Sequence, residues 1–483
     1  MSFTAAQWTA LGPLIALTAT AVVAMVGIGV HRSHRGTLII TLAGLAITIW
    51  RIWPAAHVAP VSVTPLLRLD GYALFFIGLA AGAAFVVALL AWDYLEKTEK
   101  RHEEFYVLLV IAALGAAVLA ASSDFVSFFL SLEVLSIALY GLNAYPQGRA
   151  LPLEAGIKYL VLASSSAAFL LFGMALVYAA TGTMQFATLA ARLPHASGQL
   201  VLPGVALILV GIGFKLGLVP FHLWTPDVYQ GAPAPVTAFV ATASKAGIFA
   251  VLLRYFYESS GAPSGRLFLV LTILAFASMV VGNLMALRQT NVKRILAFSS
   301  IAHMGYITVA FLAASRAAAM AAAAVGFYFL AYFITTLGAF GVIAALTSRT
   351  RGEPDGIEDY RGLFWRRPWL ALVFTAMLLS LAGIPLTAGF LAKFYIVAAG
   401  TAASLWMLLL VLFITSVIGL FYYLRIVVAL YSPLPQTIAA EGPLALPVAR
   451  TGAWVLGVLL VALVWVGVYP ATFIRMMIHF PLR

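Results

Sequence analysis

The sequence predicts an all-α polytopic membrane protein with about fourteen transmembrane helices. Hydrophobic residues make up 63% of the 483 residues and charged residues only 9%, whereas a soluble domain carries about a quarter charged residues. The apolar runs are about twenty residues long, which is the length of a helix that crosses a bilayer. The runs do not alternate with period two, so helices rather than barrel strands satisfy the backbone hydrogen bonds within lipid.

Hydropathy in windows of about nineteen residues predicts the individual spans. In chain order the spans cover residues 10–30, 37–54, 72–92, 105–121, 124–143, 157–180, 201–224, 232–256, 267–287, 294–313, 318–346, 369–396, 403–431 and 451–473. The seventh and the twelfth are interrupted by proline and glycine, between Gly213 and Pro220 and between Gly383 and Gly389.

These two interruptions predict broken helices. Proline removes a backbone donor and clashes with the preceding turn, and carbonyls freed within hydrocarbon need a protein or water partner, so such breaks line cavities. Because the breaks are five spans apart, spans 4–8 and 9–13 would form two inverted five-helix repeats with a site at the breaks. A purely structural kink is the alternative explanation for either break.

The predicted organisation is a single integral membrane domain, residues 1–483. It divides into three N-terminal spans (1–104), a first repeat (105–256), a second repeat (267–431) and a C-terminal span (451–483).

The distribution of Lys and Arg predicts the orientation. With the N-terminus outside, most basic loop residues are cytoplasmic, among them Arg32, Lys97, Arg294 and Arg367, as the positive-inside rule requires. An even number of spans then places both termini on the outer, periplasmic side. The same scattered loops account for the net charge of +12, and without a continuous basic patch we expect no nucleic-acid binding.

Ionisable residues inside the predicted spans are the main functional candidates. They are Glu133, Lys158, Lys215, Lys245 and Lys393, and each ionised group at the bilayer centre costs ~2.5–3.5 kcal/mol or more. Burial disfavours the charged form of a lysine and a nearby carboxylate favours it. A lysine beside Glu133 can therefore gain or lose a proton as that pairing changes, which a proton relay requires. The alternative is a snorkelled side chain or a structural ion pair, especially for Lys158 near a span end.

Two histidines and one arginine complete the candidates. His222 follows the first break and His303 lies in the tenth span. A histidine can carry a proton at neutral pH, although it serves equally well as a neutral helix contact. Arg425 stays protonated, so we interpret it as an anchor near the end of its span.

The sequence carries no visible apparatus for redox chemistry. It contains no cysteine, so it offers no thiolate for an iron–sulfur cluster. The glycines near Lys215 have the wrong spacing for a dinucleotide loop, and no phosphate loop or zinc-binding His-Glu-x-x-His motif is present. We therefore expect neither a cofactor nor a metal on this chain.

One stretch resembles a known family. Residues 213–236 have the sequence GFKLGLVPFHLWTPDVYQGAPAPV, which is similar to the signature of antiporter-like subunits of complex I and of multisubunit cation/proton antiporters. Within this family, residues 224–233 and the GFLAKF run at 389–394 resemble the N-type subunits of bacterial complex I. M-type subunits carry a glutamate where Lys393 stands. The resemblance extends over essentially the whole chain.

The resemblance implies roles for the buried residues. Glu133 and Lys215 would form the coupled pair of a first half-channel, Lys245 would be the central connecting group, and Lys393 would be the terminal proton carrier. Lys158 also matches a family lysine and would link to a neighbouring subunit.

The resemblance also implies the protein complex to which the chain would belong and the membrane in which it would lie. The chain would be a proton-translocating subunit of NADH:quinone oxidoreductase in a bacterial plasma (inner) membrane, with K-type and M-type subunits as neighbours. NADH, flavin, iron–sulfur clusters and quinone would bind to partner subunits.

Two other functions are compatible with the sequence. A subunit of a cation/proton antiporter would keep the buried lysines but would have no flavoprotein partner. A non-conducting scaffold would tolerate neutral residues in place of those lysines.

Overall fold

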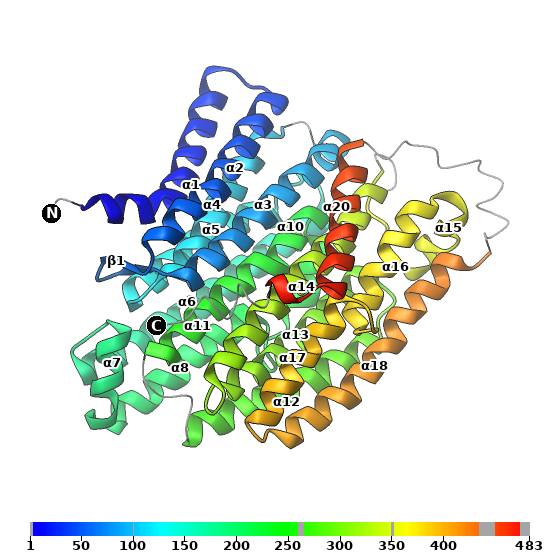
Figure 1. The fold of residues 1–483 in the computed structure, drawn as a ribbon. Helices are drawn as coiled ribbons and strands as arrows, with labels where there is room; N and C mark the ends of the chain where they lie inside the picture. Colours follow the sequence, from blue (N-terminus) through cyan, green and yellow to red (C-terminus); the bar gives the residue numbers. More distant parts are fainter. Residues whose placement is uncertain (1–2, 100, 259–264, 349–351, 434–449, 474–483) are drawn as a thin grey trace.

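The protein is a bundle of long apolar helices (Figure 1). The computed structural model describes residues 3–99, 101–258, 265–348, 352–433 and 450–473. Among these residues, thirteen helical segments are long and apolar enough to cross a membrane, and two shorter apolar helices, Pro368–Ala382 and Ala388–Ala402, follow one another directly. The predicted all-α membrane fold is confirmed.

The elements follow the chain in this order. They are α1 (Ala5–Val30), α2 (His34–Val58), β1 (Val61–Thr64), β2 (Leu67–Leu69), α3 (Gly71–Thr98), α4 (Glu103–Ala121), α5 (Phe125–Asn143), α6 (Ala150–Thr181), α7 (Phe186–Arg192), η1 (Leu193–His195), α8 (Gly198–Leu216), α9 (Trp224–Gly231), α10 (Ala234–Phe239), η2 (Val240–Ser244), α11 (Lys245–Glu258), α12 (Gly265–Leu287), α13 (Val292–Ala313), α14 (Ala318–Leu346), η3 (Ile357–Tyr360), α15 (Leu363–Arg366), α16 (Pro368–Ala382), α17 (Ala388–Ala402), α18 (Trp406–Tyr431) and α20 (Arg450–Val468).

Both predicted helix breaks are present. The seventh span consists of α8 and α9 with a turn between them, and the twelfth consists of α16 and α17. The sixth helix begins at Ala150, seven residues before the predicted start at 157, so Lys158 lies further inside its helix than expected. Of the predicted C-terminal region, residues 474–483 lie outside the described residues.

Short polar side chains explain where several helices begin. Those of Ser33, Asp70, Asp124, Asn291 and Thr387 each accept a hydrogen bond from a backbone N–H of the first turn. These N–H groups have no partner within their own helix, so each cap satisfies a donor that would otherwise be exposed to an apolar surrounding.

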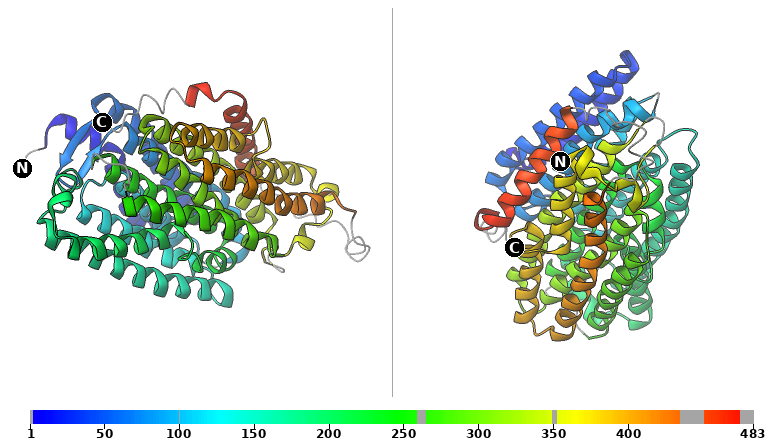
Figure 2. Two further views of the ribbon diagram at one scale, coloured as in Figure 1. Left: turned by 90° about the horizontal axis from the view of Figure 1, so that it is seen from below. Right: turned by 90° about the vertical axis from the view of Figure 1, so that its right-hand side faces the viewer.

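The centre of the bundle is formed by α10–α11, α13 and α14. An 18-residue stretch of each of the segments 234–255 and 292–313 is completely buried within the chain, and α14 is largely buried, as expected of helices that are apolar on every side. Figures 1 and 2 show α1 and α2 at one edge and α12 and α18 at the opposite edge. Polar groups on the central helices are therefore shielded from lipid by the chain's own helices.

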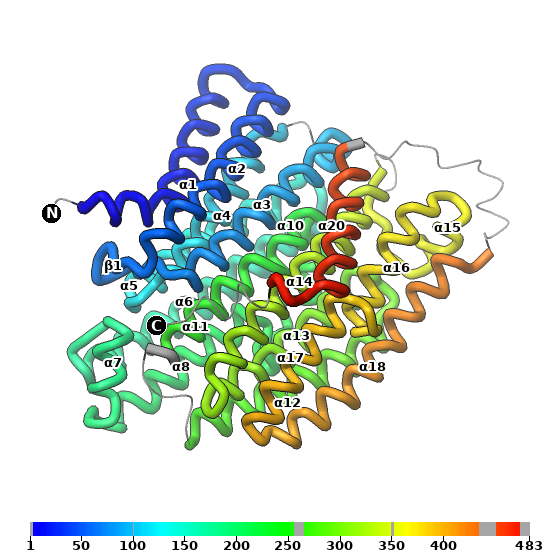
Figure 3. The backbone as a smooth tube through the Cα atoms, in the orientation of Figure 1, coloured from blue at the N-terminus to red at the C-terminus, as the bar shows by residue number. Residues whose placement is uncertain are grey.

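The last described helix, α20, packs against helices from earlier in the chain. In the tube drawing of Figure 3, α20 runs across α14, and it also packs against α3. The second half of the chain is thus tied to the three N-terminal helices.

Three features were not predicted from the sequence. Strands β1 and β2 form a small antiparallel hairpin with Val61 opposite Leu69, and α7 is a short helix between two spans. The hairpin strands and α7 are each shorter than the hydropathy window that identifies a span, so hydropathy did not reveal them. The third is the π-helix η2, which ends one residue before Lys245. Such π-bulges are frequent at functional sites.

A fully buried ion pair joins α11 to α3 and α4. The Arg254 guanidinium donates to both carboxylate oxygens of Asp70, at 2.7 and 2.9 Å, and also to the Ala120 carbonyl at the end of α4. Asp70 in turn accepts the Ala73 N–H at the start of α3. The Arg254 side chain is 1% exposed.

Replacing Arg254 with methionine is expected to destabilise the protein by about 3–5 kcal/mol, because it leaves a buried carboxylate without its counter-charge. Thermal unfolding in mild detergent measures the effect. The control is Glu358→Gln at the exposed Arg361–Glu358 pair, which should cost under about 1 kcal/mol. Equal effects of the two substitutions would contradict a structural role for the buried pair.

Candidate functional site: buried lysines at two helix breaks

The first break has a specific backbone geometry. Helix α8 ends at Leu216, and Gly217 follows in the left-handed region with φ of 71°. The Leu218 N–H donates to the Gly213 carbonyl at 2.8 Å and the Gly217 N–H to the Phe214 carbonyl at 2.9 Å. This is the Schellman pattern, in which a left-handed glycine terminates a helix.

The second break repeats this geometry. Helix α16 ends at Ala382, and Gly383 follows with φ of 86°. The Ile384 N–H donates to the Leu379 carbonyl and the Gly383 N–H to the Ser380 carbonyl, both at 3.0 Å. The same two bonds at the same offsets argue against two unrelated kinks, and they agree with a repeated unit.

A lysine ammonium lies at each of the two helix ends. A Cβ built on Gly217 would lie 3.7 Å from Lys245 Nζ, and one built on Gly383 would lie 3.1 Å from Lys393 Nζ. Lys393 Nζ also donates to the Ala382 carbonyl at 2.8 Å. The carbonyl end of a helix carries a partial negative charge, so each broken helix directs that end at a lysine ammonium.

Substituting Gly383 with alanine is expected to weaken the proton translocation that the family resemblance implies. The left-handed backbone costs alanine roughly 1–2 kcal/mol, and its Cβ would lie 3.0–3.3 Å from Lys393 Cδ, Nζ and Cε, which displaces the ammonium. Proton uptake by membrane vesicles measures the effect. The control is Gly82→Ala, where a Cβ meets no atom within 4 Å, and indistinguishable uptake in both variants would contradict this role.

Lys215 and Glu133 lie together in the first half of the chain. Lys215, 3% exposed, donates to the Ser136 hydroxyl of α5 at 2.6 Å. Glu133 lies one turn earlier on α5, and its buried Oε1 atom has no hydrogen-bond partner among the described residues. Ser136 therefore accepts the bond from the ammonium, and the carboxylate lies beside this contact.

Lys245 occupies the centre of the bundle and is completely buried. Its ammonium donates to the Ser300 hydroxyl of α13 at 2.7 Å. The hydroxyl of Tyr332 on α14 donates to the same oxygen at 2.7 Å, and that of Tyr229 lies 3.2 Å from it. Lys245 and Tyr229 belong to the predicted first repeat and Ser300 and Tyr332 to the second, so Ser300 joins the two halves.

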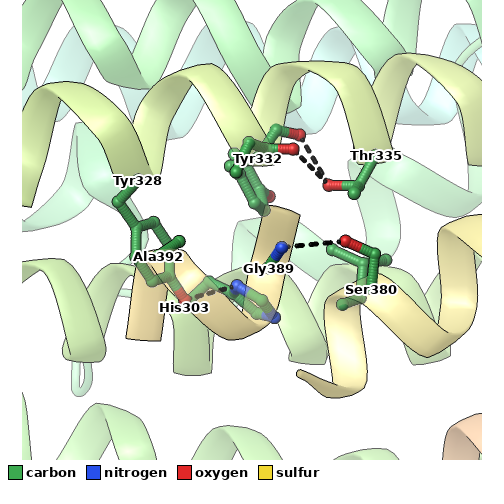
Figure 4. A pocket seen from close by; sticks show the side chains of 9 residues that line it. His303, Tyr328, Tyr332, Thr335, Ser380, Gly389 and Ala392 are labelled. Atoms are coloured by element: carbon green, nitrogen blue, oxygen red, sulfur yellow. Dashed lines mark hydrogen bonds between the residues drawn. The ribbon is translucent and has the colours of Figure 1, made fainter. Parts of the chain in front are cut away.

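His303 lies one turn beyond Ser300 on α13. Its Nδ1 is 2.8 Å from the Tyr328 hydroxyl and its Nε2 is 3.4 Å from that of Tyr423. Figure 4 shows the ring at the wall of a small cavity, which is lined by His303, Tyr328, Ala331, Tyr332, Thr335, Ser380, Leu381, Gly389 and Ala392. The cavity has room for about one water molecule.

Lys215, Lys245 and Lys393 each also lie over an aromatic ring. The distance from Nζ to the ring centre is 5.6 Å for Lys215 over Tyr159 and 5.5 Å for Lys245 over Tyr229. It is 5.3 Å for Lys393 over Tyr306. The negative face of a tyrosine ring attracts a cation, so each ring offsets part of the cost of placing an ammonium in apolar surroundings.

Lys158 lies apart from these lysines. Its side chain is 41% exposed and forms ion pairs with Glu154 at 2.7 Å and Asp227 at 2.8 Å. Asp227 also pairs with Arg294 at 2.7 Å. Charged groups on an outer helix face are unfavourable against lipid, so this cluster suits a protein neighbour or the membrane surface better than the lipid core.

His222 lies in the turn between α8 and α9, mostly buried at 9% exposure. Its Nδ1 atom has no hydrogen-bond partner in the described part of the chain. The structure brings His303, but not His222, into the hydroxyl cluster around Lys245. Arg425 donates to the carbonyls of Leu287 and Gln289 at the end of α12, in keeping with an anchor.

Polar contacts of Lys293 and Glu353 fix the end of α9, the second half of the broken seventh span. Lys293 donates to the Ala232 carbonyl at 2.7 Å and forms a close ion pair with Glu353. Glu353 accepts the Ala234 N–H at 2.8 Å. The loop after α14 therefore fixes the turn between α9 and α10.

Sequence reasoning missed the hydroxyl groups around Lys215, Lys245 and His303. These are Ser136, Ser300, Tyr328, Tyr332 and Tyr423. Tyr328 and Tyr332 are four residues apart, a spacing that places two side chains on one helix face, and this was the available signal. Serine and tyrosine cost little in a membrane helix, so hydropathy does not single them out. Within the described residues, no group of three or more His, Asp or Glu side chains is placed to hold a metal ion.

Two similar helix breaks with lysines at their carbonyl ends define a broken-helix membrane protein of the antiporter type. The model of the family "NADH:quinone oxidoreductase/Mrp antiporter, TM" matches residues 122–419. The chain belongs to this family.

Full-length relatives narrow the comparison. NADH-quinone oxidoreductase subunit N of Ectopseudomonas mendocina (strain ymp) is 45% identical over 476 residues, which cover 97% of this chain and 96% of that protein. A chain of respiratory complex I from Thermus thermophilus with bound aureothin is 33% identical with a TM-score of 0.80, covering 96% of this chain and 98% of its own. Within the family, the chain is thus similar to N-type subunits over nearly its whole length.

Two further structures share the fold. A chain of the membrane-bound sulfane sulfur reductase, an archaeal respiratory membrane complex, is 29% identical with a TM-score of 0.84. A chain of the Mrp complex from Dietzia sp. DQ12-45-1b has a TM-score of 0.83 at 21% identity. Each match covers 98% of this chain and 96% of the other chain. At 21% identity the Mrp likeness concerns the fold alone.

Proposed function

We propose that this chain is a proton-translocating membrane-arm subunit of a bacterial NADH:quinone oxidoreductase and that it moves protons through Glu133, Lys215, Lys245 and Lys393. The observation that carries the proposal is a set of three lysines that have no direct carboxylate partner among the described residues. Lys215 and Lys245 are buried, Lys393 is partly buried, and Lys245 and Lys393 lie at the carbonyl ends of broken helices. Such costly groups persist in a membrane protein where they serve a pathway. The similarity to subunit N supports the choice of complex.

The first half-channel begins at Lys215 and Glu133. A proton arriving from the cytoplasm occupies the Lys215 amine, and the negative charge of Glu133 favours the resulting ammonium. When Glu133 is neutralised, or its charge is drawn to another partner, that support is lost. Lys215 then releases its proton toward Lys245.

The second half-channel carries the proton outward. Lys245 accepts it at the bundle centre and passes it to Lys393 at the second break. Lys393 lies beyond the break, on the helix half that leads to the proposed outer side, and it releases the proton there. His303 lies between these lysines, and we assign it an auxiliary role in the transfer. Lys158 and His222 remain auxiliary candidates at the cytoplasmic part of the route.

The proposal places the electron-transfer chemistry on other polypeptides. NADH, flavin, iron–sulfur clusters and quinone would bind partner subunits, and the energy would reach this chain as an electrostatic or conformational signal. K-type and M-type subunits are the proposed neighbours. The exposed charges of Glu154, Lys158 and Asp227 suit such a contact. Both termini would lie on the outer side of the bacterial inner membrane.

A cation/proton antiporter subunit is the second candidate, favoured by the family model, whose description covers the Mrp antiporter as well as NADH:quinone oxidoreductase. Purification of the tagged chain in mild detergent separates the two. We expect copurifying flavoprotein and NADH:quinone electron transfer. A stable complex that has neither flavin nor redox activity would overturn the assignment and favour the antiporter.

A further inference from the structure

We propose that the hydroxyl groups of Ser300 and Tyr332 carry the proton from Lys245 to His303, across the boundary between the two halves of the chain. This inference rests on the proposed function and extends it to two residues outside the charged relay.

Ser300 is the shared acceptor at this boundary. Its oxygen receives hydrogen bonds from the Lys245 ammonium and from the Tyr332 hydroxyl, both 2.7 Å long. Ser300 is 1% exposed and Tyr332 is 4% exposed. In such dry surroundings protons move along hydrogen-bonded groups, and Ser300 is the direct hydrogen-bond partner of the Lys245 ammonium.

Tyr332 extends this contact toward His303. The two rings lie with their centres 5.3 Å apart, and both line the cavity of Figure 4. The cavity has room for about one water molecule, and His303 and Tyr332 supply polar atoms at its wall. A single water therefore suffices to connect the Tyr332 hydroxyl with the imidazole or with the Tyr328 hydroxyl bonded to it.

The proton balance is simple. Lys245 gives one proton to Ser300 Oγ while Ser300 gives its own to the Tyr332 oxygen. Tyr332 releases its proton to the cavity water, and the water releases one to His303. Each hydroxyl ends with the proton count it began with, and only the imidazole gains a charge. Before the transfer the two hydroxyls must turn, because Tyr332 donates to Ser300 at the start.

The ring of Tyr332 has a second, structural task. It also lines a neighbouring cavity, together with Leu296, Ser299, Thr336, Ala339, Phe340 and Leu381. Removing the whole side chain would join the two cavities and alter the packing. Tyr332→Phe keeps the ring and deletes only the hydroxyl, so it isolates the chemical contribution.

The test uses the intact complex in membrane vesicles. We expect Tyr332→Phe and Ser300→Ala each to lower proton translocation by about tenfold or more, with unchanged amounts of assembled complex. Ser300→Thr, which retains a hydroxyl, should recover at least half of the wild-type rate. If Ser300 had only a structural role, Ser300→Thr would not translocate protons faster than Ser300→Ala.

Two controls delete hydroxyls outside the proposed path. Thr308 lies on the same helix as Ser300, and among the described residues its hydroxyl bonds only the Met304 carbonyl one turn earlier, so Thr308→Val should translocate normally. Tyr360 is a buried tyrosine bonded to the Pro354 carbonyl, and Tyr360→Phe controls for tyrosine loss.

The outcomes are distinguishable from a failure of the proposed function. Wild-type rates in both Ser300→Ala and Tyr332→Phe would overturn the inference, and if Lys245→Arg still blocked translocation, the lysine relay would stand without it. Absence of redox-driven translocation in the wild-type complex would instead overturn the proposed function and this inference with it.

Discussion

Replacing Lys215 with methionine is expected to lower redox-driven proton translocation by ~100-fold, the lower end of what a positioned proton-transfer group contributes. Methionine matches the length of the side chain but cannot carry a proton or donate to Ser136, the present partner of the ammonium. The rate of proton uptake by inside-out vesicles, normalised to assembled complex, measures the effect. Glu133→Gln should act in the same direction, because it removes the charge that favours the Lys215 ammonium.

The matched control for this pair is Ser165→Ala on α6. In the part of the chain that the structure describes, the Ser165 hydroxyl bonds only the Val161 carbonyl, at the exposed helix face. Normal uptake in this variant is expected. If Glu133→Gln and Lys215→Met both translocated protons and turned over at the wild-type rate, the pair would have no part in the mechanism. The scaffold interpretation would then be favoured.

Lys393→Arg is expected to stop translocation although it preserves the positive charge. Arginine cannot be deprotonated in a protein, but its guanidinium can still donate to the Ala382 carbonyl that now receives the Lys393 bond at 2.8 Å. A lysine that only neutralises the end of α16 would therefore be replaceable by arginine, whereas a proton carrier would not. Proton uptake by vesicles measures the effect.

Assembly serves as the internal control for Lys393→Arg. The variant complex should be recovered in normal amounts, with its NADH-oxidising flavoprotein attached. Recovery of full translocation would assign Lys393 a purely structural role at the helix end. Loss of assembly would be checked with Lys393→Met, which removes the charge and the donor together.

The fold was predictable because the solvent of this chain is lipid. Apolar runs of span length leave no other choice of structure, and the two Pro/Gly interruptions marked both helix breaks. The ends of helices were harder: α6 begins at Ala150, because Pro152 is compatible with a first turn while hydropathy rises only later. The hairpin of β1 and β2 escaped because a span-length window averages over such short elements.

Only the charged residues of the candidate site were predictable, because a charge inside an apolar span is costly and therefore stands out. Lys215, Lys245 and Lys393 stand out in apolar runs, and the structure places two of them at helix breaks. Lys158, in contrast, belongs to an exposed ion-pair cluster, and Arg254 belongs to a buried ion pair. Ser300 and Tyr332 lie near Lys245 because of the way α11, α13 and α14 pack. A single sequence does not show which residues of these helices are in contact. The transport roles of all these residues stay predictions.

The most direct test of the central claim concerns Lys245, the fully buried lysine between the two halves. The measurement is redox-driven proton uptake by vesicles that contain Lys245→Arg, compared with Lys293→Arg. Lys293 is equally buried but is paired with Glu353 away from the breaks, so arginine keeps its charge and its function. The account predicts uptake below about a tenth of wild type for Lys245→Arg and near-normal uptake for Lys293→Arg. Normal uptake by the Lys245→Arg complex would contradict a relay that depends on deprotonation of this lysine.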